Sequence, residues 1–386
     1  MTLTVLPRSP ANILRILPAL ALLALAAPVT VQGAKNDREQ LPPEIVALVE
    51  AKVHEEMAKN SVPGLTVAIA WEGQIRYSKA FGLADIENQV PARTDTRFRT
   101  ASIAKSLTAT AVMKLVELGL IDLDADIREY VPAFPQQDKE ILVRHVLSHQ
   151  SGIRHYDDWS EAVGTVSYAD LEQTLRIFAK DELVQVPGAA FHYTTFGYTL
   201  LGLAIEAVTG ETYEAAMQQL VWEPADMTYT GIDHHFEVIP NRARGYARLE
   251  SQDDIPIGMR GRVQVGDLIR AELHDTSMKV PGGGMVSTAE DLARFGLAML
   301  EERLVSHATR ELMWTAARDA SEAETPYGMG WWMNAGNITH GGGQAGTTCM
   351  LAIRESNGVV VAMMSNLQRP NNVPFLAESL TELMGR

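Results

Sequence analysis

A serine and a lysine stand three residues apart in Ser102-Ile103-Ala104-Lys105, the only Ser-x-x-Lys in the chain. Apolar residues in helical spacing, with Gly119 as a stop, predict a helix over 102–118. Both side chains then share one face, so that the lysine amine can take the serine proton. The free N–H groups and positive dipole end of a helix start favour an oxyanion. The tetrapeptide therefore predicts a serine nucleophile with a lysine base, and a simple helix cap is the alternative.

A tyrosine and a glycine-rich segment supply further candidates. Tyr193 lies in the loop before a helix predicted at 195–208, where its phenol can relay a proton between the serine and a leaving group. His340-Gly341-Gly342-Gly343 lies in a predicted strand, where the missing side chains allow close approach of a ligand. The N–H groups of Gly343 and Ser102 can then form the donor pair that an acyl-transfer oxyanion requires. Taken singly, a structural tyrosine and a strand bend explain these residues equally well.

Strand patterns at both ends of the chain and helical patterns between them must position these residues. Strands are predicted over 65–71, 74–81, 327–334, 349–354 and 359–365, with a hairpin turn at Asn357-Gly358. Helices are predicted over 44–59, 102–118, 141–148, 168–178, 195–208, 213–220, 291–300 and 374–384. This order predicts an α+β fold in which a central antiparallel sheet, built from both chain ends, is flanked by helices. A helical lobe is expected at roughly 125–280, with a cleft beside it.

The order Ser-x-x-Lys, Tyr-x-Thr, His-Gly-Gly resembles that of the penicillin-recognising serine hydrolases, in the branch of the class C β-lactamases and DD-peptidases. The resemblance covers about residues 41–386, which we expect to form one β-lactamase-like domain. It extends to runs shared with the mitochondrial serine β-lactamase-like proteins of this family. These runs are Ser106-Leu107-Thr108, Ser151-Gly152-Ile153-Arg154-His155-Tyr156, Thr195-Phe196-Gly197-Tyr198-Thr199-Leu200-Leu201 and Asn241-Arg242-Ala243-Arg244.

The resemblance implies a role for each motif. Ser102 would be the acylated nucleophile, Lys105 its base partner and Tyr193 the proton shuttle. The backbone N–H groups of Ser102 and Gly343 would hold the oxyanion, and Gly341 and Gly342 would bind substrate beside them. No metal or organic cofactor is implied, and the expected partner is a small-molecule or peptide substrate.

Two positions depart from the class C pattern. Thr195 stands where those β-lactamases have asparagine, and His340 stands where they have a lysine that supports the charge of the tyrosine. We count Thr195 as substrate-binding and His340 as catalytic, and we do not expect efficient β-lactam hydrolysis. The interpretation is an acyl-enzyme hydrolase acting on a peptide, a D-amino-acid peptide or an ester. The alternatives are a β-lactamase or penicillin-binding protein, and a scaffold or filament-forming relative with little catalysis.

Charge and composition exclude several classes. The 386-residue chain has a formal net charge of -15, which opposes binding to nucleic acid. Its first 33 residues hold two arginines, no acids and an apolar run too short for a spanning helix, so we expect a signal peptide at 1–33 and an exported, periplasmic protein. An N-terminal membrane anchor is the less favoured alternative. Cys349 is the single cysteine, which excludes an internal disulfide, and we expect it in the core.

Other hydrolase classes fit the sequence poorly. His145 and His149 have helical i, i+4 spacing, but the glutamate of a His-Glu-x-x-His metalloprotease is missing, so we predict no metal and expect both histidines to cap or hydrogen-bond the loop around Ser151. No Gly-x-Ser-x-Gly elbow of an α/β-hydrolase occurs. Three aromatic residues before the third motif, Tyr327, Trp331 and Trp332, are expected to serve mainly in packing. An oligomer is possible on these observations.

Overall fold

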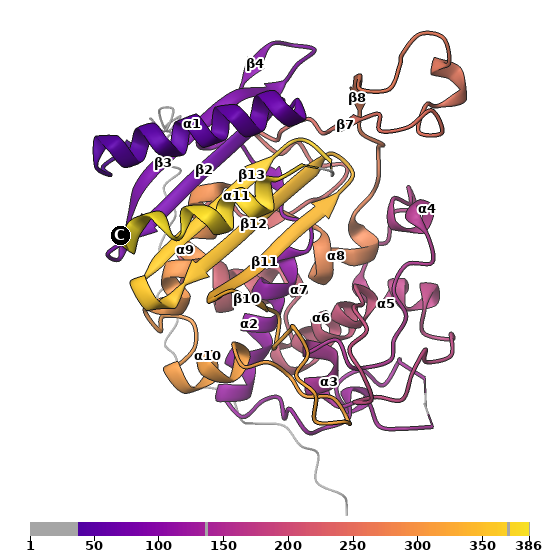
Figure 1. Cartoon of the computed structure of the whole chain (residues 1–386). Helices are drawn as coiled ribbons and strands as arrows, with labels where there is room; N and C mark the ends of the chain where they lie inside the picture. Colours follow the sequence, from indigo (N-terminus) through magenta and orange to yellow (C-terminus); the bar gives the residue numbers. More distant parts are fainter. Residues whose placement is uncertain (1–37, 136–137, 369–370, 386) are drawn as a thin grey trace, which may run out of the picture. The chain divides into compact units, whose positions relative to one another are not determined.

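The computed structural model describes residues 38–135, 138–368 and 371–385, and the predicted signal peptide lies outside them (Figure 1). An eight-stranded antiparallel sheet has the order β1-β3-β2-β13-β12-β11-β10, with β4 paired to β3. Its strands are β1 (Arg38–Glu39), β2 (Gly64–Trp71), β3 (Gln74–Asp85), β4 (Val90–Pro91), β10 (Trp332–Asn334), β11 (Asn337–Gln344), β12 (Thr347–Arg354) and β13 (Val359–Ser365). Strands from both ends of the described chain thus meet at its centre, where β2 pairs with β13.

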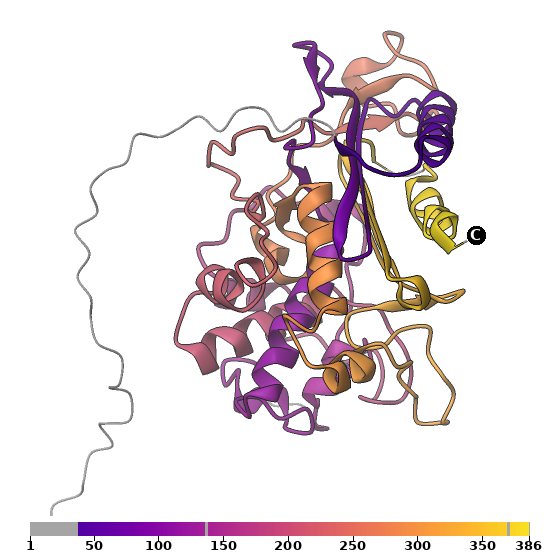
Figure 2. The ribbon, with the colours of Figure 1, turned by 90° about the vertical axis from the view of Figure 1, so that its left-hand side faces the viewer.

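Helices cover both faces of this sheet (Figures 1 and 2). Helices α1 (Pro43–Asn60) and α11 (Val373–Leu380) pack on one face, and α2 (Ile103–Glu117) and α9 (Ala289–Leu300) pack on the other. Successive side chains of a strand point to opposite faces of the sheet, so β13 contributes to both hydrophobic cores. Val361 belongs to the core under α1, and its neighbour Val360 belongs to the core under α9. The predicted α+β class is confirmed by this arrangement.

The middle of the chain is mainly helical and also contributes small sheets. Its helices are α3 (Val143–Leu147), α4 (Trp159–Ala162), α5 (Leu171–Thr174), α6 (Phe196–Thr209), α7 (Tyr213–Met217), α8 (Val280–Gly283) and α10 (His307–Met313). A three-stranded sheet joins β5 (Phe98–Arg99), β9 (Met285–Ser287) and β6 (Gly231–Ile232), and β7 (Tyr246–Arg248) pairs with β8 (Leu268–Arg270). Among the described residues, no helix is long and apolar enough to cross a lipid bilayer.

Single-turn helices complete the described chain. They are the 3₁₀ turns η1 (Ile127–Glu129), η2 (Leu175–Ile177), η4 (Ile257–Met259), η5 (Ser277–Lys279), η6 (Glu355–Asn357) and η7 (Leu383–Gly385), and the π turn η3 (Gln218–Trp222).

Three predicted elements are shorter than the sequence suggested. The helix predicted at 168–178 is broken into α5 and η2, and the final helix ends at Leu380. The strand predicted at 327–334 is reduced to β10. Its first half leaves the sheet because Gly330, at φ +86°, packs on α2, where an added Cβ would lie 2.4 Å from the Cβ of Ala109. The short strands β5 to β9 were not predicted.

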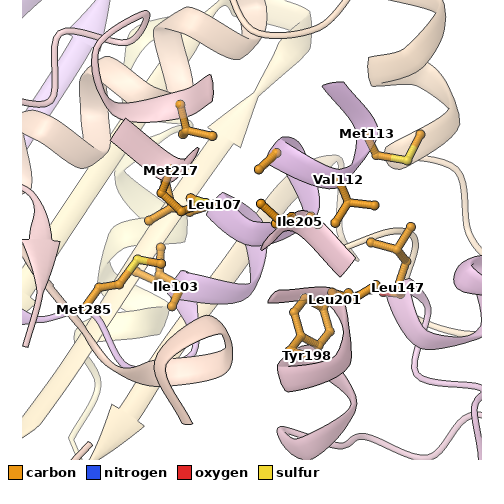
Figure 3. Close-up of a cluster of buried hydrophobic side chains, with 14 of the residues drawn as sticks. Ile103, Leu107, Val112, Met113, Leu147, Tyr198, Leu201, Ile205, Met217 and Met285 are labelled. Carbon is orange, nitrogen blue, oxygen red and sulfur yellow. Dashed lines mark hydrogen bonds between the residues drawn. The ribbon is translucent and has the colours of Figure 1, made fainter. Parts of the chain in front are cut away.

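Helix α2 runs through the core beneath the sheet. Ile103, Leu107 and Val112 are fully buried, and Figure 3 shows them among side chains that include Leu201 and Ile205 of α6. A helix with apolar residues on all sides is held by packing rather than by an amphipathic face. The start of α2 is therefore fixed rigidly with respect to the surrounding helices.

Candidate active site

Ser102 lies at the first turn of α2, directly after a strained residue. Ala101 has φ +45°, a left-handed conformation that non-glycine residues rarely adopt and that often marks functional sites. The N–H groups of Ile103 and Ala104 already donate to the carbonyls of Thr100 and Ala101, at 3.2 and 3.0 Å. The expectation of several free N–H groups at this helix start is therefore wrong. Among the described residues, the N–H of Ser102 has no acceptor, so this one remains for a ligand.

Lys105 lies next to Ser102 in a fully buried position. Its Nζ is 3.3 Å from Oγ of Ser102, 3.1 Å from Oγ1 of Thr195 and 2.6 Å from the carbonyl oxygen of Gly282. No carboxylate of the described chain forms an ion pair with it. Burial, and next the charge of Lys279, hold the pKa of Lys105 well below its usual value. As a neutral amine it can donate to Gly282 and Thr195 and turn its lone pair to the Ser102 hydroxyl.

Tyr193 is held beside this lysine by aromatic rings on two sides. The Nζ of Lys105 lies 4.9 Å from the centre of the Tyr193 ring. The ring of Trp332 is nearly parallel to that of Tyr193 at 6.2 Å, and His149 lies 4.2 Å away between centroids. The Nδ1 of His149 accepts a hydrogen bond from the N–H of Thr194, which ties this packing to the loop that carries Tyr193.

The two histidines weighed as metal ligands serve local structure. Nδ1 of His145 accepts from the N–H of Leu142 at 3.3 Å, and Nδ1 of His149 is taken by Thr194. Burial, followed by the charge of Lys105, keeps the pKa of His149 well below its usual value, so its ring is neutral behind Tyr193.

The glycine-rich strand lies directly against the segment that leads to Ser102. An added Cβ on Gly342 would lie 2.3 Å from the carbonyl oxygen of Thr100 and 2.6 Å from Sγ of Cys349. Cys349 is buried as expected, and its thiol lies 3.0 Å from the same Thr100 oxygen. Pairing of β11 with β10 ends at Thr339, so no strand of the described chain lies beside the edge of β11 from His340 onward on that side. Gly343 lies on this open edge.

His340 is buried at the start of that edge. Its Nδ1 lies 2.8 Å from the carbonyl oxygen of Gly341, and its Nε2 lies 3.0 Å from the hydroxyl of Tyr327. A carbonyl only accepts, so Nδ1 carries a proton. The ring of Tyr327 meets that of Tyr193 edge to face at 6.4 Å. Tyr327, expected mainly to pack, therefore connects His340 to Tyr193.

The other two aromatic residues before the third motif divide between core and cleft. Trp331 is fully buried and stacks on Phe295, as expected for packing. Trp332 lines the cleft around Ser102.

Two adjoining clefts meet at Ser102. We call the first, of about 310 Å³, the Lys279 cleft, because Lys279 is the one lysine or arginine among its described lining residues. The second, of about 710 Å³, is the His340 cleft. The residues lining both are Ser102, His155, Trp159, Tyr193, Gly343 and Gln344. Thr195 lines the first, and His340 and Gly341 line the second. Lys105 and Gly342 line neither cleft: Lys105 is buried beside Ser102, and Gly342 packs against Thr100.

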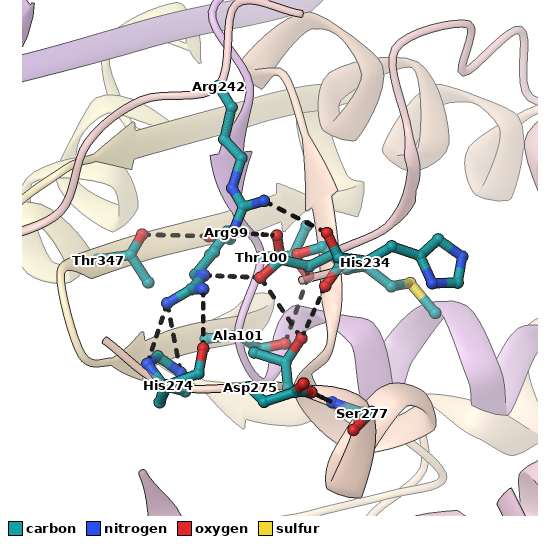
Figure 4. A network of polar contacts seen from close by, with 12 residues as sticks. Arg99, Thr100, Ala101, His234, Arg242, His274, Asp275, Ser277 and Thr347 are labelled. Atoms are coloured by element: carbon teal, nitrogen blue, oxygen red, sulfur yellow. Dashed lines mark hydrogen bonds and ion pairs between the residues drawn. The ribbon is translucent and has the colours of Figure 1, made fainter. Parts of the chain in front are cut away.

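A buried ionic network fixes the approach to Ser102 (Figure 4). Arg99, in β5, lies 2.7 Å from Asp233, and Arg242 lies 2.9 Å from the other oxygen of the same carboxylate. Arg99 also lies 3.0 Å from Nδ1 of His274. Burial, followed by the charge of Arg99, lowers the pKa of His274 to about 2, so this ring is neutral. The network anchors the strand that ends two residues before Ala101.

Several cleft residues were missed from the sequence, among them Trp159, Gln344, His155 and Lys279. His155 belongs to one of the shared runs, and its Nδ1 accepts the N–H of Thr195 at 3.2 Å. Burial, followed by the charge of Lys105, lowers the pKa of His155 to about 3. Lys279 stands alone before Pro281 and the glycine run, and no motif signals it.

Residues 49–382 match the model of the Beta-lactamase family. The chain belongs to the β-lactamase family. The serine beta-lactamase-like protein LACTB of human mitochondria is 28% identical over 417 aligned residues, which cover 79% of this chain and 74% of LACTB. The mouse LACTB is 27% identical over the same shares. The predicted family is therefore confirmed.

Solved structures show the same fold. The octameric penicillin-binding protein homologue from Pyrococcus abyssi superposes with a TM-score of 0.73 at 27% identity, over 88% of this chain and 78% of that one. The D-amino acid amidase from Ochrobactrum anthropi SV3 superposes with a TM-score of 0.73 over 87% of this chain and 96% of the amidase. At 23% identity, the second likeness concerns the fold alone.

Proposed function

We propose that this member of the β-lactamase family is an exported serine hydrolase that cleaves an amide or ester bond through an acyl-enzyme on Ser102. The observation that carries the proposal is the buried amine of Lys105, which lies 3.3 Å from Oγ of Ser102 and has no acidic partner among the described residues. A lysine base needs a lowered pKa to act at neutral pH, and burial supplies it here.

Acylation follows from the placement of four groups. Neutral Lys105 takes the hydroxyl proton as Oγ of Ser102 bonds to the substrate carbonyl carbon. The N–H groups of Ser102 and Gly343 hold the oxyanion that forms. As the carbonyl bond to the leaving nitrogen or oxygen breaks, Tyr193 gives that atom its phenolic proton and regains one from Lys105. Water then attacks the acyl-enzyme ester, the acid is released, and Oγ recovers its proton.

The substrate proposed is a peptide, a D-amino-acid peptide or an ester. His340 replaces the lysine of the class C enzymes, and its imidazole is held between Gly341 and Tyr327. It therefore reaches Tyr193 through a second ring rather than with a flexible ammonium. This difference supports amide or ester substrates over β-lactams, and a β-lactamase or penicillin-binding protein remains the alternative.

A scaffold function is the second candidate, because the Pyrococcus abyssi homologue is octameric. Light scattering of the parent and of Ser102→Ala tests whether assembly depends on the nucleophile.

Intact-protein mass spectrometry tests the acyl-enzyme directly. The parent chain, Ser102→Ala and Ser321→Ala are each incubated with a fluorophosphonate and, separately, with a penicillin. We expect one fluorophosphonate adduct on the parent and on Ser321→Ala, whose exposed serine serves as the matched control, and none on Ser102→Ala. A stable penicillin adduct would favour the penicillin-binding alternative. Equal labelling of Ser102→Ala, or no labelling of the parent by either reagent, would overturn the proposal and leave the scaffold function.

A further inference from the structure

Lys279 is a second buried lysine beside the nucleophile, and the mechanism above does not use it. It lies at the end of η5 with 4% of its surface exposed, and it lines the Lys279 cleft together with Ser102. Lysine is almost never buried to this degree without a partner of opposite charge. Its placement therefore calls for a specific explanation.

The ammonium of Lys279 is only partly satisfied. Its Nζ donates to the carbonyl oxygen of Ala162 at 2.6 Å and lies 5.5 Å from the centre of the Tyr156 ring. Within the described chain, no carboxylate lies within 4 Å of it. An ammonium has three donors, so two remain for a ligand.

The charges around Lys279 favour an anion as that ligand. Asp233 is already bound by Arg99 and Arg242, so these groups and Lys279 together carry a positive excess. Asp158 also lines the cleft, but it is exposed, and its carboxylate already accepts hydrogen bonds from Ser160 and from the N–H of Glu161. Burial, followed by the charge of Arg99, lowers the pKa of Lys279 to about 7. An anion in the cleft would offset the local positive charge and raise the pKa of Lys279, because a nearby opposite charge favours the protonated amine.

Lys279 also lies close enough to the reacting serine to contact a bound substrate. A Cβ placed on Gly283 would lie 3.8 Å from the carbonyl carbon of Ala101 and 3.8 Å from Cδ of Lys279. One methyl group would therefore touch both the backbone before Ser102 and the lysine stem. An ester or amide held at Ser102 therefore shares the Lys279 cleft with this lysine.

We propose that Lys279 is a specificity-determining residue that binds a carboxylate of the substrate, so that the hydrolase prefers esters or amides carrying an anionic group near the scissile bond. This inference rests on the proposed Ser102 hydrolase. The carboxylate belongs either to the acyl part or to the leaving group, and both are recognised by the same two donors.

Matched ester pairs test the preference. The 4-nitrophenyl monoester of glutaric acid is compared with 4-nitrophenyl pentanoate for the acyl side, and 3-acetoxybenzoate with its methyl ester for the leaving-group side. Background hydrolysis is measured with Ser102→Ala. Hydrogen bonds to charged groups correspond to about a 10- to 100-fold effect, and we expect a preference of this size in kcat/KM for the anionic member of one pair.

The variants assign the preference to one side chain. Lys279→Met keeps the apolar stem against Tyr156, and Lys279→Gln keeps a donor. Both should lose the preference, measured as the ratio of kcat/KM for the anionic and neutral esters of the same variant, in which a change in the pKa of Lys105 cancels. The control Lys180→Met removes an exposed lysine of equal charge and should keep the preference. If the parent hydrolyses the neutral esters without preferring either anion, or if both Lys279 variants keep the preference, the inference is wrong and the proposed hydrolase stands.

A binding measurement separates the two proposals if no ester is turned over. Titration calorimetry of Ser102→Ala with glutarate should give binding at least 10-fold tighter than that of the double variant Ser102→Ala/Lys279→Met. If no ester is hydrolysed but glutarate binds more tightly to Ser102→Ala than to the double variant, the proposed reaction is wrong and the anion site stands. Equal binding by the two variants would remove the anion site.

Discussion

Lys105 and Lys279 are both buried near Ser102, but they have different hydrogen-bond partners. Lys105 has three neighbours within 3.3 Å, all of them uncharged, whereas Lys279 has a single carbonyl. Burial lowers the pKa of both, and the charge of Lys279 lowers that of Lys105 further. A substrate anion on Lys279 would partly cancel this last effect. If both proposals hold, the charge of the substrate would change the basicity of Lys105, the proposed base for Ser102.

This coupling gives a pH dependence with a definite sign. Lys279 is cationic below its pKa of about 7 and neutral above it, so the preference for the anionic ester should be full at pH 6 and fall as the pH rises. Above the pKa the ratio falls by up to about tenfold per pH unit, because only the protonated fraction binds the anion, until no preference remains. The measurement is the ratio of kcat/KM for the anionic and neutral esters from pH 6 to 9, in which the titration of the catalytic groups largely cancels. Lys279→Met should give a flat ratio, and a flat ratio for the parent would contradict the assignment.

At the scale of elements, the site is a contact between the start of α2 and the open edge of β11. Three features hold that contact: the buried body of α2, the Arg99 network behind β5, and the absence of a side chain at Gly342. The third is the tightest, because Gly342 lies against the backbone of Thr100. The distance between the two proposed oxyanion donors, the N–H groups of Ser102 and Gly343, should therefore depend on this close approach.

Gly342→Ala should therefore separate the two elements. Its methyl group would meet the Thr100 oxygen at 2.3 Å, so β11 must move or the carbonyl must turn. Overpacking of this kind costs about 1–3 kcal/mol in the free energy of unfolding. Since loss of one oxyanion donor slows catalysis by about 10²–10³, we expect fluorophosphonate labelling to slow at least tenfold. Labelling rate and denaturant unfolding are measured on the same samples.

A strand glycine elsewhere supplies the matched control. Gly231, in β6, has open space where a Cβ would stand, so Gly231→Ala should leave the labelling rate unchanged. If Gly342→Ala labels at the parent rate, the close packing of β11 on the nucleophile segment does not set the oxyanion geometry.

At the scale of the whole molecule, the sequence predicted those elements whose apolar residues recur with a regular spacing and end at a turn residue. Helix α2 follows from its apolar spacing and Gly119, and strands β12 and β13 follow from their apolar runs and the turn at Gly358, which has φ +67°. The order of the motifs along the chain gave the family and, with it, the residues that meet around Ser102. Their roles stay predictions until labelling and kinetics are done.

What the sequence did not predict depends on contacts between distant segments. Lys279 lies near Ser102 only because α8 packs beside α2, and nothing in its neighbours marks a buried cation. Tyr327 reaches His340 because the chain before β10 turns away from the sheet onto α2. The helix expected at 168–178 is divided into two short turns, and its apolar residues Leu171 and Leu175 are buried from α5 and η2 respectively. The periodicity of apolar residues along the sequence does not indicate which distant segments pack together.

The described residues, 38–135, 138–368 and 371–385, belong to one compact unit, which gives the last prediction. The sheet, both of its helical layers and every proposed site residue belong to this unit. A chain that begins at Ala34 should therefore keep its free energy of unfolding within about 0.5 kcal/mol of the full chain, the range usual for changes outside the core, and should react with fluorophosphonate at the same rate. Denaturant unfolding and labelling check both.

A chain that begins at Gly64 is the control. It lacks α1, whose Val49 and Val53 are fully buried against the sheet, and it should unfold far more easily. Should the Ala34 chain lose as much stability as this control, residues 1–33 would belong to the working fold, and the prediction of a removable signal peptide would be wrong.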